Sequence, residues 1–147
     1  MKRKYVVFRV GDGQFGIALE EVVKVVRFEN VVDVPTAPAY VEGVLNLGGE
    51  VVPILNLRMR LSVPRLGVNR QHRVIVVERD LRRFGLLVDA VRDILELDEE
   101  SIITEAIAVP GMKSEYVVGI AKIQDHLLVL LDIFRILSAA PASSVAR

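Results

Sequence analysis

Short apolar stretches recur along this chain between polar residues and glycines, a pattern that favours strands rather than helices. Each stretch is rich in valine, leucine, isoleucine or aromatic residues and is bounded by glycine or charged residues, which is typical of strands in small all-β proteins. Many short strands at a spacing of about ten residues indicate small β-barrels. The predicted strands cover residues 5–10, 14–18, 22–28, 44–47, 51–55, 73–78, 84–88, 92–97, 117–123 and 127–131.

Turn and cap residues complete this pattern. Residues 48–49 are both glycine and separate two predicted strands, which predicts a hairpin because glycine readily adopts the positive φ of such turns. Asn56 and Asp132 each precede an apolar stretch and are candidate N-caps. We therefore expect two short helical segments, over residues 57–61 and 133–140.

The second half of the chain repeats the first. Residues 84–95 resemble residues 15–26, because both stretches open with Phe-Gly, have an acid at the sixth position and a valine at the eighth. Residues 116–123 likewise resemble residues 40–47. The repeat predicts that Gly16 is equivalent to Gly85, and Gly43 to Gly119.

Two repeats predict two similar subdomains related by a pseudo-two-fold axis. We expect a first barrel over residues 1–69 and a second barrel over residues 70–147, the latter with a C-terminal helix and a short tail. The link between them is expected near Pro64 and Gly67, which disfavour regular structure.

Composition narrows the functional class. The 147 residues are 52% hydrophobic and 26% charged, as in a globular protein. There is no cysteine, which excludes disulfides and thiolate metal sites and fits a reducing cytoplasm. The uninterrupted apolar runs are far shorter than the ~20 residues of a membrane-spanning helix, and no signal peptide is recognisable. We therefore expect a cytoplasmic protein without direct membrane insertion.

Charge is unevenly distributed along the chain. Residues 58–83 hold eight arginines and two acids, whereas residues 84–115 hold eight acids and two basic residues. The arginine-rich centre leaves open an alternative function, a small β-barrel that binds nucleic acid. Such a protein also needs exposed aromatic residues for base stacking, and the chain has only five phenylalanines and three tyrosines.

Little in the sequence indicates catalysis. His72 and His126 are the only histidines, and they lie in different halves without metal-ligand spacing. A hydrolase using His126 and Asp132 would lack a paired nucleophile. The Gly-x-Gly-x-x-Gly string over residues 11–16 leads into a predicted strand, whereas a dinucleotide fingerprint opens a helix. We predict no enzymatic activity, no cofactor and no metal site.

Two acids at equivalent positions of the repeat, Glu20 and Asp89, stand out within apolar surroundings. Either they cap backbone amides at the turn into the next strand, or they contact a partner.

Three segments resemble the CheW family of chemotaxis coupling proteins. They are residues 41–58 (VEGVLNLGGEVVPILNLR), 85–91 (GLLVDAV) and 114–119 (SEYVVG). The likeness extends from about Lys4 to Ser138. It implies two SH3-like, five-stranded barrels and a non-enzymatic adaptor. Such an adaptor bridges the cytoplasmic tip of chemoreceptors to the regulatory domain of the histidine kinase CheA, within arrays where CheW-like domains also form rings.

The resemblance also implies where the partners bind. The kinase contact is expected on the first barrel at Val6, Leu19 and Val22, although the same residues could instead belong to the core. The receptor is expected in a groove between the barrels. Its expected contacts are Val25, Asn46, Gly48, Arg73, Gly85 and Val88.

One position departs from the family pattern. The hairpin of the family usually reads Asn-Leu-Arg-Gly, whereas residues 46–49 here read Asn-Leu-Gly-Gly. The missing arginine is associated with receptor coupling in the family. We expect Arg58 or Arg73 to substitute for it, or the chain to serve a divergent pathway.

Overall fold

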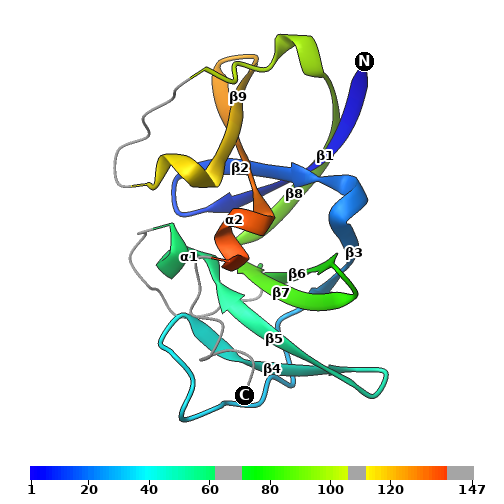
Figure 1. The fold of residues 1–147 in the computed structure, drawn as a ribbon, viewed down its shortest axis with the longest axis vertical. Coiled ribbons are helices and arrows are strands. Elements are labelled where there is room, and N and C mark those ends of the chain that lie inside the picture. Colours follow the sequence, from blue (N-terminus) through cyan, green and yellow to red (C-terminus); the bar gives the residue numbers. More distant parts are fainter. Residues whose placement is uncertain (62–70, 106–111, 139–147) are drawn as a thin grey trace.

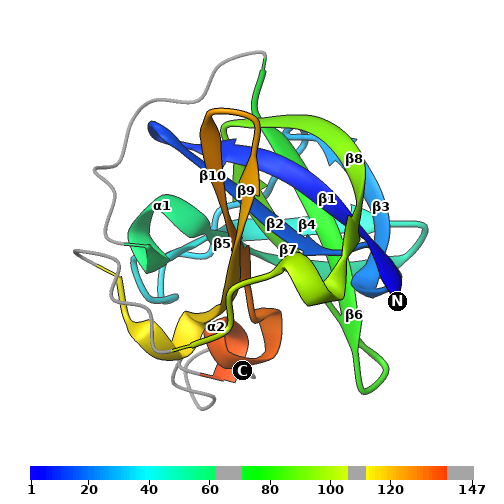
Figure 2. The ribbon, with the colours of Figure 1, turned by 90° about the horizontal axis from the view of Figure 1, so that it is seen from above.

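The computed structural model describes residues 1–61, 71–105 and 112–138, which form two five-stranded sheets (Figure 1; Figure 2 gives the view from above). In order across sheet 1 lie β8 (Ala90–Asp98), β1 (Lys2–Val10), β2 (Gly13–Ala18), β10 (His126–Leu131) and β9 (Val117–Ile123). In order across sheet 2 lie β3 (Val22–Arg27), β6 (Arg73–Arg79), β7 (Arg82–Val88), β5 (Glu50–Asn56) and β4 (Val41–Leu47). The expected mainly-β class and all ten strands are confirmed, and the two sheets fit SH3-like barrels.

Helical segments are short. Two are α-helical, α1 (Leu57–Arg60) and α2 (Ile133–Ser138), and three are 3₁₀ turns, η1 (Leu19–Glu21), η2 (Glu99–Ser101) and η3 (Ser114–Tyr116). Both predicted caps are confirmed: Asn56 Oδ1 accepts a hydrogen bond from the amide of Arg58 at 2.9 Å, and Asp132 Oδ1 accepts one from Arg135 at 3.1 Å. The expected link near Pro64 and the expected tail lie outside the described residues.

The two halves of the chain exchange strands. Sheet 1 contains β1 and β2 from the first half of the chain and β8, β9 and β10 from the second. Sheet 2 contains β3, β4 and β5 from the first half and β6 and β7 from the second. The two halves are joined within each sheet by parallel pairing of β10 with β2 and of β5 with β7. The expected boundary at residues 69–70 therefore does not separate the barrels. Alternating hydrophobicity specifies which face of a strand is buried, but it does not specify which strand lies alongside.

Glycines explain how the exchanged strands fit together. Gly16 pairs with Leu130 across β2 and β10, and Gly85 pairs with Ile54 across β7 and β5. A Cβ atom at Gly16 would lie 2.9 Å from Leu130 Cδ2, and one at Gly85 would lie 3.2 Å from Ile54 Cγ1. The missing side chain leaves room for the branched residue of the neighbouring strand, so the predicted equivalence of these glycines is confirmed.

The second pair of glycines lies where a loop covers an edge strand. Gly43 pairs with Ile54 and Gly119 with Leu130, which are themselves equivalent in the repeat. Beside them, isolated bridges join Val32 to Val44 on β4 and Ile103 to Ile120 on β9. A Cβ atom at Gly43 would clash with the Val32 carbonyl oxygen, and one at Gly119 would lie 2.9 Å from that of Ile103. Glycine thus lets the loop backbone pack against the strand in both halves.

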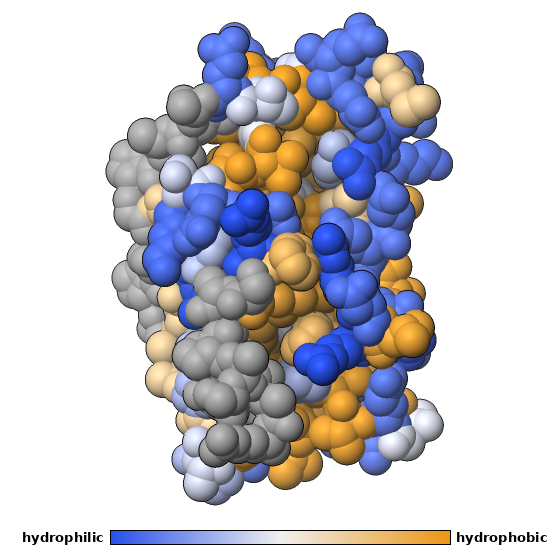
Figure 3. All heavy atoms as spheres, viewed as in Figure 1, coloured by the Kyte–Doolittle hydropathy of each residue, from blue (hydrophilic) through white to orange (hydrophobic). Residues whose placement is uncertain are grey.

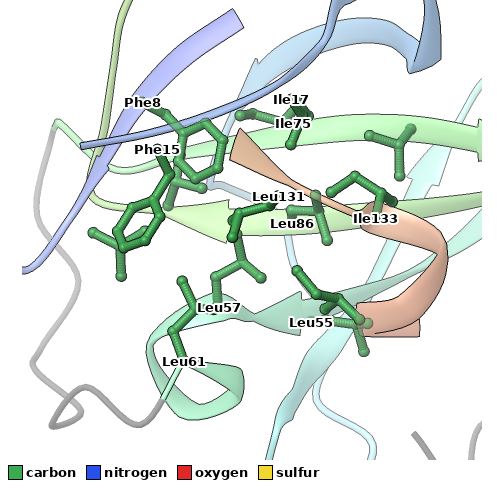
Figure 4. Packing of buried hydrophobic residues seen from close by; sticks show 14 of the residues in the cluster. Phe8, Phe15, Ile17, Leu55, Leu57, Leu61, Ile75, Leu86, Leu131 and Ile133 are labelled. Atoms are coloured by element: carbon green, nitrogen blue, oxygen red, sulfur yellow. The ribbon is translucent and has the colours of Figure 1, made fainter. Parts of the chain in front are cut away.

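The main core lies between the two sheets, where side chains from both point toward one another (Figure 4). It includes Phe8, Phe15 and Ile17 from sheet 1 and Leu55, Ile75 and Leu86 from sheet 2. Two smaller clusters fill the individual barrels, one around Tyr5 and Leu128 and one around Ile54 and Val74. Because most of the largest buried side chains belong to this shared cluster, neither sheet could bury its apolar face alone.

Replacing Gly43 with alanine tests the close contact between loop and strand. We expect Gly43→Ala to lower the free energy of unfolding by about 1–3 kcal/mol, because the backbone at Val32 must shift to admit a methyl group. Gly48→Ala is the control: its φ of +57° costs alanine about 1 kcal/mol, but its Cβ would meet no atom within 4 Å, so Gly43→Ala should be the less stable variant. Chemical denaturation of both variants measures the difference. Equal stability of the two variants would contradict the packing described here.

Candidate functional site

The residues expected to contact a kinase lie near the junction of the two sheets but differ in accessibility. Val6, in β1, is only 2% exposed and belongs to the main core, so in this structure it is not a surface residue. Leu19, in η1, and Val22, at the start of β3, are partly buried and pack against the same core. Val6 is therefore a core residue, and of the three residues only Leu19 and Val22 are accessible to a partner.

The residues expected to contact a receptor all lie in or beside sheet 2. Val25, on β3, is 41% exposed, while Asn46 and Gly48 are exposed on the β4–β5 hairpin. Arg73 and Val88 are register partners on β6 and β7. Because β3 and β4 are the two edge strands of this sheet, the exposed residues form two separate groups in the strand order.

Two of the expected receptor contacts are inaccessible. Val88 is 1% exposed and belongs to the main core, and Gly85 is buried where its missing side chain admits Ile54. Their role in this structure is packing. Arg73 is half-buried and donates a hydrogen bond to the carbonyl oxygen of His72 at 2.9 Å, so it remains partly accessible.

The β4–β5 hairpin has the conformation expected for its two glycines. Gly48 and Gly49 have φ values of +57° and +93°, as a type I′ turn requires. Asn46 Oδ1 accepts a hydrogen bond from the amide of Gly49 at 2.8 Å. In the β9–β10 hairpin Gln124, which is equivalent to Gly48, has a φ of +54°. The same turn position therefore accommodates a long side chain in the other half.

A buried charge cluster lies where the chain passes from one sheet to the other. Asp89 is the single residue between β7 of sheet 2 and β8 of sheet 1. Its carboxylate accepts hydrogen bonds from the amide of Gly11 at 2.8 Å and from Arg58 Nε at 2.9 Å, with a further ion pair to Arg58 Nη2. Arg9 Nη1 lies 3.6 Å from it, and His72 Nε2 lies 3.9 Å from it. The cluster thus ties the β1–β2 hairpin and α1 to the crossover.

The environment shifts the pKa values of both buried groups. Burial by itself would raise the pKa of Asp89, but the hydrogen bonds from Arg58 and Gly11 and the charge of Arg58 outweigh it, so the pKa is lowered and the carboxylate is charged. Burial is the main cause that lowers the pKa of His72; the charge of Asp89 acts in the opposite direction, and the charges of Arg58 and Arg9 lower the pKa further. The histidine is therefore neutral at neutral pH.

The equivalent acid in the first half behaves differently. Glu20 lies on η1 at the other crossover, is exposed, and forms a surface ion pair with Arg3. The prediction that an acid caps a backbone amide is thus confirmed for Asp89, although the amide belongs to the distant Gly11, and is wrong for Glu20.

Arg58 does not replace the missing hairpin arginine. Its side chain is 9% exposed and is held by Asp89, so it is unavailable to a partner. The sequence did not indicate that Arg58 and Asp89 form a pair, although Arg58 ends the family-like segment 41–58 and Asp89 lies in the family-like segment 85–91. Of the two expected substitutes, only Arg73 has an accessible side chain.

The arginines of this centre that the structure describes are largely engaged within the protein. Arg60 stacks over Tyr40 with its guanidinium carbon 4.8 Å from the ring centroid, Arg79 stacks over Phe134 at 4.5 Å, and Arg83 pairs with Glu78 and Glu50. Nothing in this arrangement supports the nucleic-acid alternative, which also requires exposed aromatic platforms.

The surface carries exposed apolar side chains, and Figure 3 shows hydrophobic residues running down the middle of one face, with hydrophilic residues along its right side. Exposed apolar residues occur at equivalent positions of the repeat, including Val25 with Ile94 and Val51 with Leu127. Such residues are suited to protein contacts. In residues 1–61, 71–105 and 112–138 no group of three or more histidine, aspartate or glutamate side chains could hold a metal ion, and no helix is long and apolar enough to cross a membrane.

Comparisons with known proteins agree with the fold. A family model, the CheW-like domain, matches residues 4–140. The "Chemotaxis protein CheW" of Rhizobium meliloti is 32% identical over 131 residues, covering 89% of this chain and 84% of that protein. The protein of the same name from Bacillus subtilis is 28% identical over 142 residues, covering 96% and 90%. The crystal structure of the scaffolding protein TtCheW from Thermoanaerobacter tengcongensis superposes with a TM-score of 0.83 at 31% identity, covering 90% of this chain and 86% of that one.

Neutralising Asp89 tests the buried cluster. We expect Asp89→Asn to lower the free energy of unfolding by about 3–5 kcal/mol, because it leaves the Arg58 charge buried without its partner. Glu20→Gln is the matched control at the equivalent exposed position and should cost at most about 1 kcal/mol. Urea unfolding at neutral pH compares them.

The stability that the Asp89–Arg58 pair contributes depends on pH. Because the pKa of Asp89 is lower in the folded than in the unfolded protein, its stabilising contribution is complete above the unfolded pKa, about 4, and is lost as pH falls below it. The asparagine variant should lack that part of the acid dependence. A variant as acid-sensitive as the wild type would show that Asp89 is not the titrating group.

Proposed function

Because the chain belongs to the family of CheW-like domains, we propose that it is a non-enzymatic adaptor that couples chemoreceptors to a CheA-type histidine kinase in chemosensory signalling. The observation that carries this proposal is the match of residues 4–140 to one family, the CheW-like domain. Exposed apolar residues at the sheet edges supply surfaces for protein partners. The proposal places the protein in the cytoplasm, beneath receptor arrays.

We propose that the regulatory domain of the kinase binds around Leu19 and Val22. These residues follow one another across the crossover from β2 to β3, and both present part of their side chain beside the main core. A partly exposed aliphatic side chain backed by a rigid core loses little conformational entropy when a partner covers it, which favours an interface anchor.

Val22→Ala tests this surface without adding a buried charge. We expect about fivefold weaker binding to the regulatory domain, equivalent to about 1 kcal/mol, because an interface anchor is truncated. Val118→Ala, an exposed valine on β9, is the control and should bind as the wild type does. Isothermal titration beside a thermal melt separates binding from folding. Unchanged affinity of a folded Val22→Ala protein would place the kinase elsewhere.

We propose that the receptor tip contacts sheet 2 at two places: the β3–β6 side, through Val25 and the accessible part of Arg73, and the β4–β5 hairpin, through Asn46. Valine and the arginine stem offer apolar contact, and the asparagine amide and the guanidinium offer hydrogen bonds. An apolar helical hairpin seated against such a surface is a recurring mode of peptide recognition. Gly85 and Val88 would support this surface from within the sheet.

Gly48→Arg tests whether the hairpin is a receptor contact. The turn should tolerate arginine at a cost of about 1 kcal/mol, since Gln124 has nearly the same φ in the other hairpin. We expect receptor-tip binding to strengthen by about fivefold, as for one charge-assisted hydrogen bond, and the gain to diminish with added salt.

Gly48→Gln is the matched control for this change, because it imposes the same backbone strain without the charge. Titration of both variants with a receptor-tip fragment at two salt concentrations compares them. If the arginine variant binds no better than the glutamine variant at low salt, position 48 is not a coupling contact here, whatever the outcome of the kinase experiment.

A further inference from the structure

A second polar cluster lies where α1, η3 and α2 come together, and Figure 2 shows these elements along one side of the molecule. Four buried side-chain nitrogen and oxygen atoms of the described residues have no hydrogen-bond partner. Two of them, on Arg9 and His72, belong to the charge cluster around Asp89. The other two are Arg60 Nε and the hydroxyl oxygen of Tyr40. A buried donor without an acceptor is destabilising, so this second pair needs an explanation.

The guanidinium of Arg60 contacts two tyrosines. Its Cζ atom is 4.8 Å from the ring centroid of Tyr40 and 6.0 Å from that of Tyr116. Its Nη2 atom donates a hydrogen bond to the Tyr116 hydroxyl at 3.1 Å and a longer one to the carbonyl oxygen of Ile136 at 3.4 Å. These contacts hold the guanidinium between α1 and α2 but leave its Nε hydrogen without an acceptor.

The repeat indicates that packing alone does not require an arginine at this position. The residue equivalent to Arg60 is Ile136, at the same offset that relates Tyr40 to Tyr116. Ile136 is 0% exposed and belongs to the main core, whereas Arg60 is half-buried, so part of its side chain reaches the surface. An aliphatic side chain therefore serves in the second half, and a cation with an unused donor stands in the first.

The cluster carries positive charge without a counter-ion. Lys113, an exposed residue just before η3, has its Nζ atom 5.9 Å from the ring centroid of Tyr116, so both cations lie at most 6.0 Å from one ring. Within the described residues neither Arg60 nor Lys113 forms an ion pair. An aromatic face attracts a cation but does not neutralise it. The cluster thus has more donors than acceptors and two uncompensated charges.

We propose that this cluster binds a phosphate group through Arg60, Lys113 and the Tyr40 hydroxyl. Arginine and hydroxyl donors suit phosphate oxygens, and two cations match the charge of a dianion. A water molecule would satisfy the donors but would leave both charges uncompensated. Because Arg60 Nε and the Tyr40 hydroxyl are covered, binding requires these two half-buried side chains to turn toward the side where Lys113 is exposed. The inference does not rest on the proposed adaptor function.

Isothermal titration with inorganic phosphate at constant ionic strength tests the site. We expect saturable binding with a Kd on the order of 1 mM, at least about tenfold weaker in Arg60→Gln and about threefold weaker in Lys113→Gln, because each change removes a charge-assisted hydrogen bond. Arg82→Gln removes an exposed arginine on β7 and is the matched control, which should bind as the wild type does. Acetate, a monoanion, should bind at least about fivefold more weakly than phosphate.

Tyr40→Phe separates a ligand contact from a structural role. Since the hydroxyl is buried without a partner, its removal should leave the melting temperature unchanged or higher. Phosphate affinity should nevertheless fall about threefold, because the ligand loses one donor. A lower melting temperature with unchanged phosphate affinity would show that the hydroxyl is structural and would contradict its place in the site.

Glycerol 3-phosphate distinguishes the two sources of such a group. Binding of the ester tighter than that of inorganic phosphate assigns the site to a small phosphate ester, and equal or weaker binding assigns it to the free ion. Thermal melts establish that each variant folds; if Arg60→Gln does not, Lys113→Gln and Tyr40→Phe decide. The proposal is overturned if millimolar phosphate gives no saturable binding, if acetate binds as tightly as phosphate, or if the folded variants bind phosphate as the wild type does.

Discussion

The parallel pairing of strands from different halves is the constraint on which the rest of this structure depends. β5 lies against β7 and β10 against β2, so neither half of the chain can complete a sheet by itself. These contacts bring Leu55 and Leu86 side by side and set Gly16 and Gly85 under the branched residues of the neighbouring strand. The core between the sheets follows from this exchange. An adaptor built this way holds surfaces from both halves in one fixed relation.

The molecule departs from its own symmetry where charge is involved. At one crossover between the sheets an aspartate is buried with Arg58, and at the other the equivalent glutamate lies in solvent with Arg3. The same contrast appears along the edge strands, where Lys24 and Arg27 correspond to Asp93 and Glu96. Duplication thus supplied two similar scaffolds, and the charged positions distinguish them. A protein that must present different surfaces to different partners requires such differences.

Much of the fold could be predicted from sequence because its signals are local. The ten strands, the glycine hairpin and the caps at Asn56 and Asp132 each depend on a few neighbouring residues. The strand exchange could not be predicted, because the apolar residues of β2 could pack beside any strand with an apolar face and do not specify β10 as its neighbour. The exposure of single residues was harder to predict: Val6 and Val88 stand in uninterrupted apolar runs, where the sequence does not show which side chains face the core between the sheets and which face outward. The burial of Arg58 depends on Asp89, a residue of the other half, and no local pattern of charge reveals such a pair.

In the proposed function, one molecule joins a receptor to a kinase. The most direct measurement is sedimentation of a labelled kinase regulatory domain with an assembled receptor-tip fragment, with and without this protein. We expect the kinase domain to sediment with the receptor only when the adaptor is present, and the amount to rise with adaptor concentration to saturation. An equal amount of kinase domain with the receptor in the absence of the protein, or none in its presence, would contradict the proposed adaptor role.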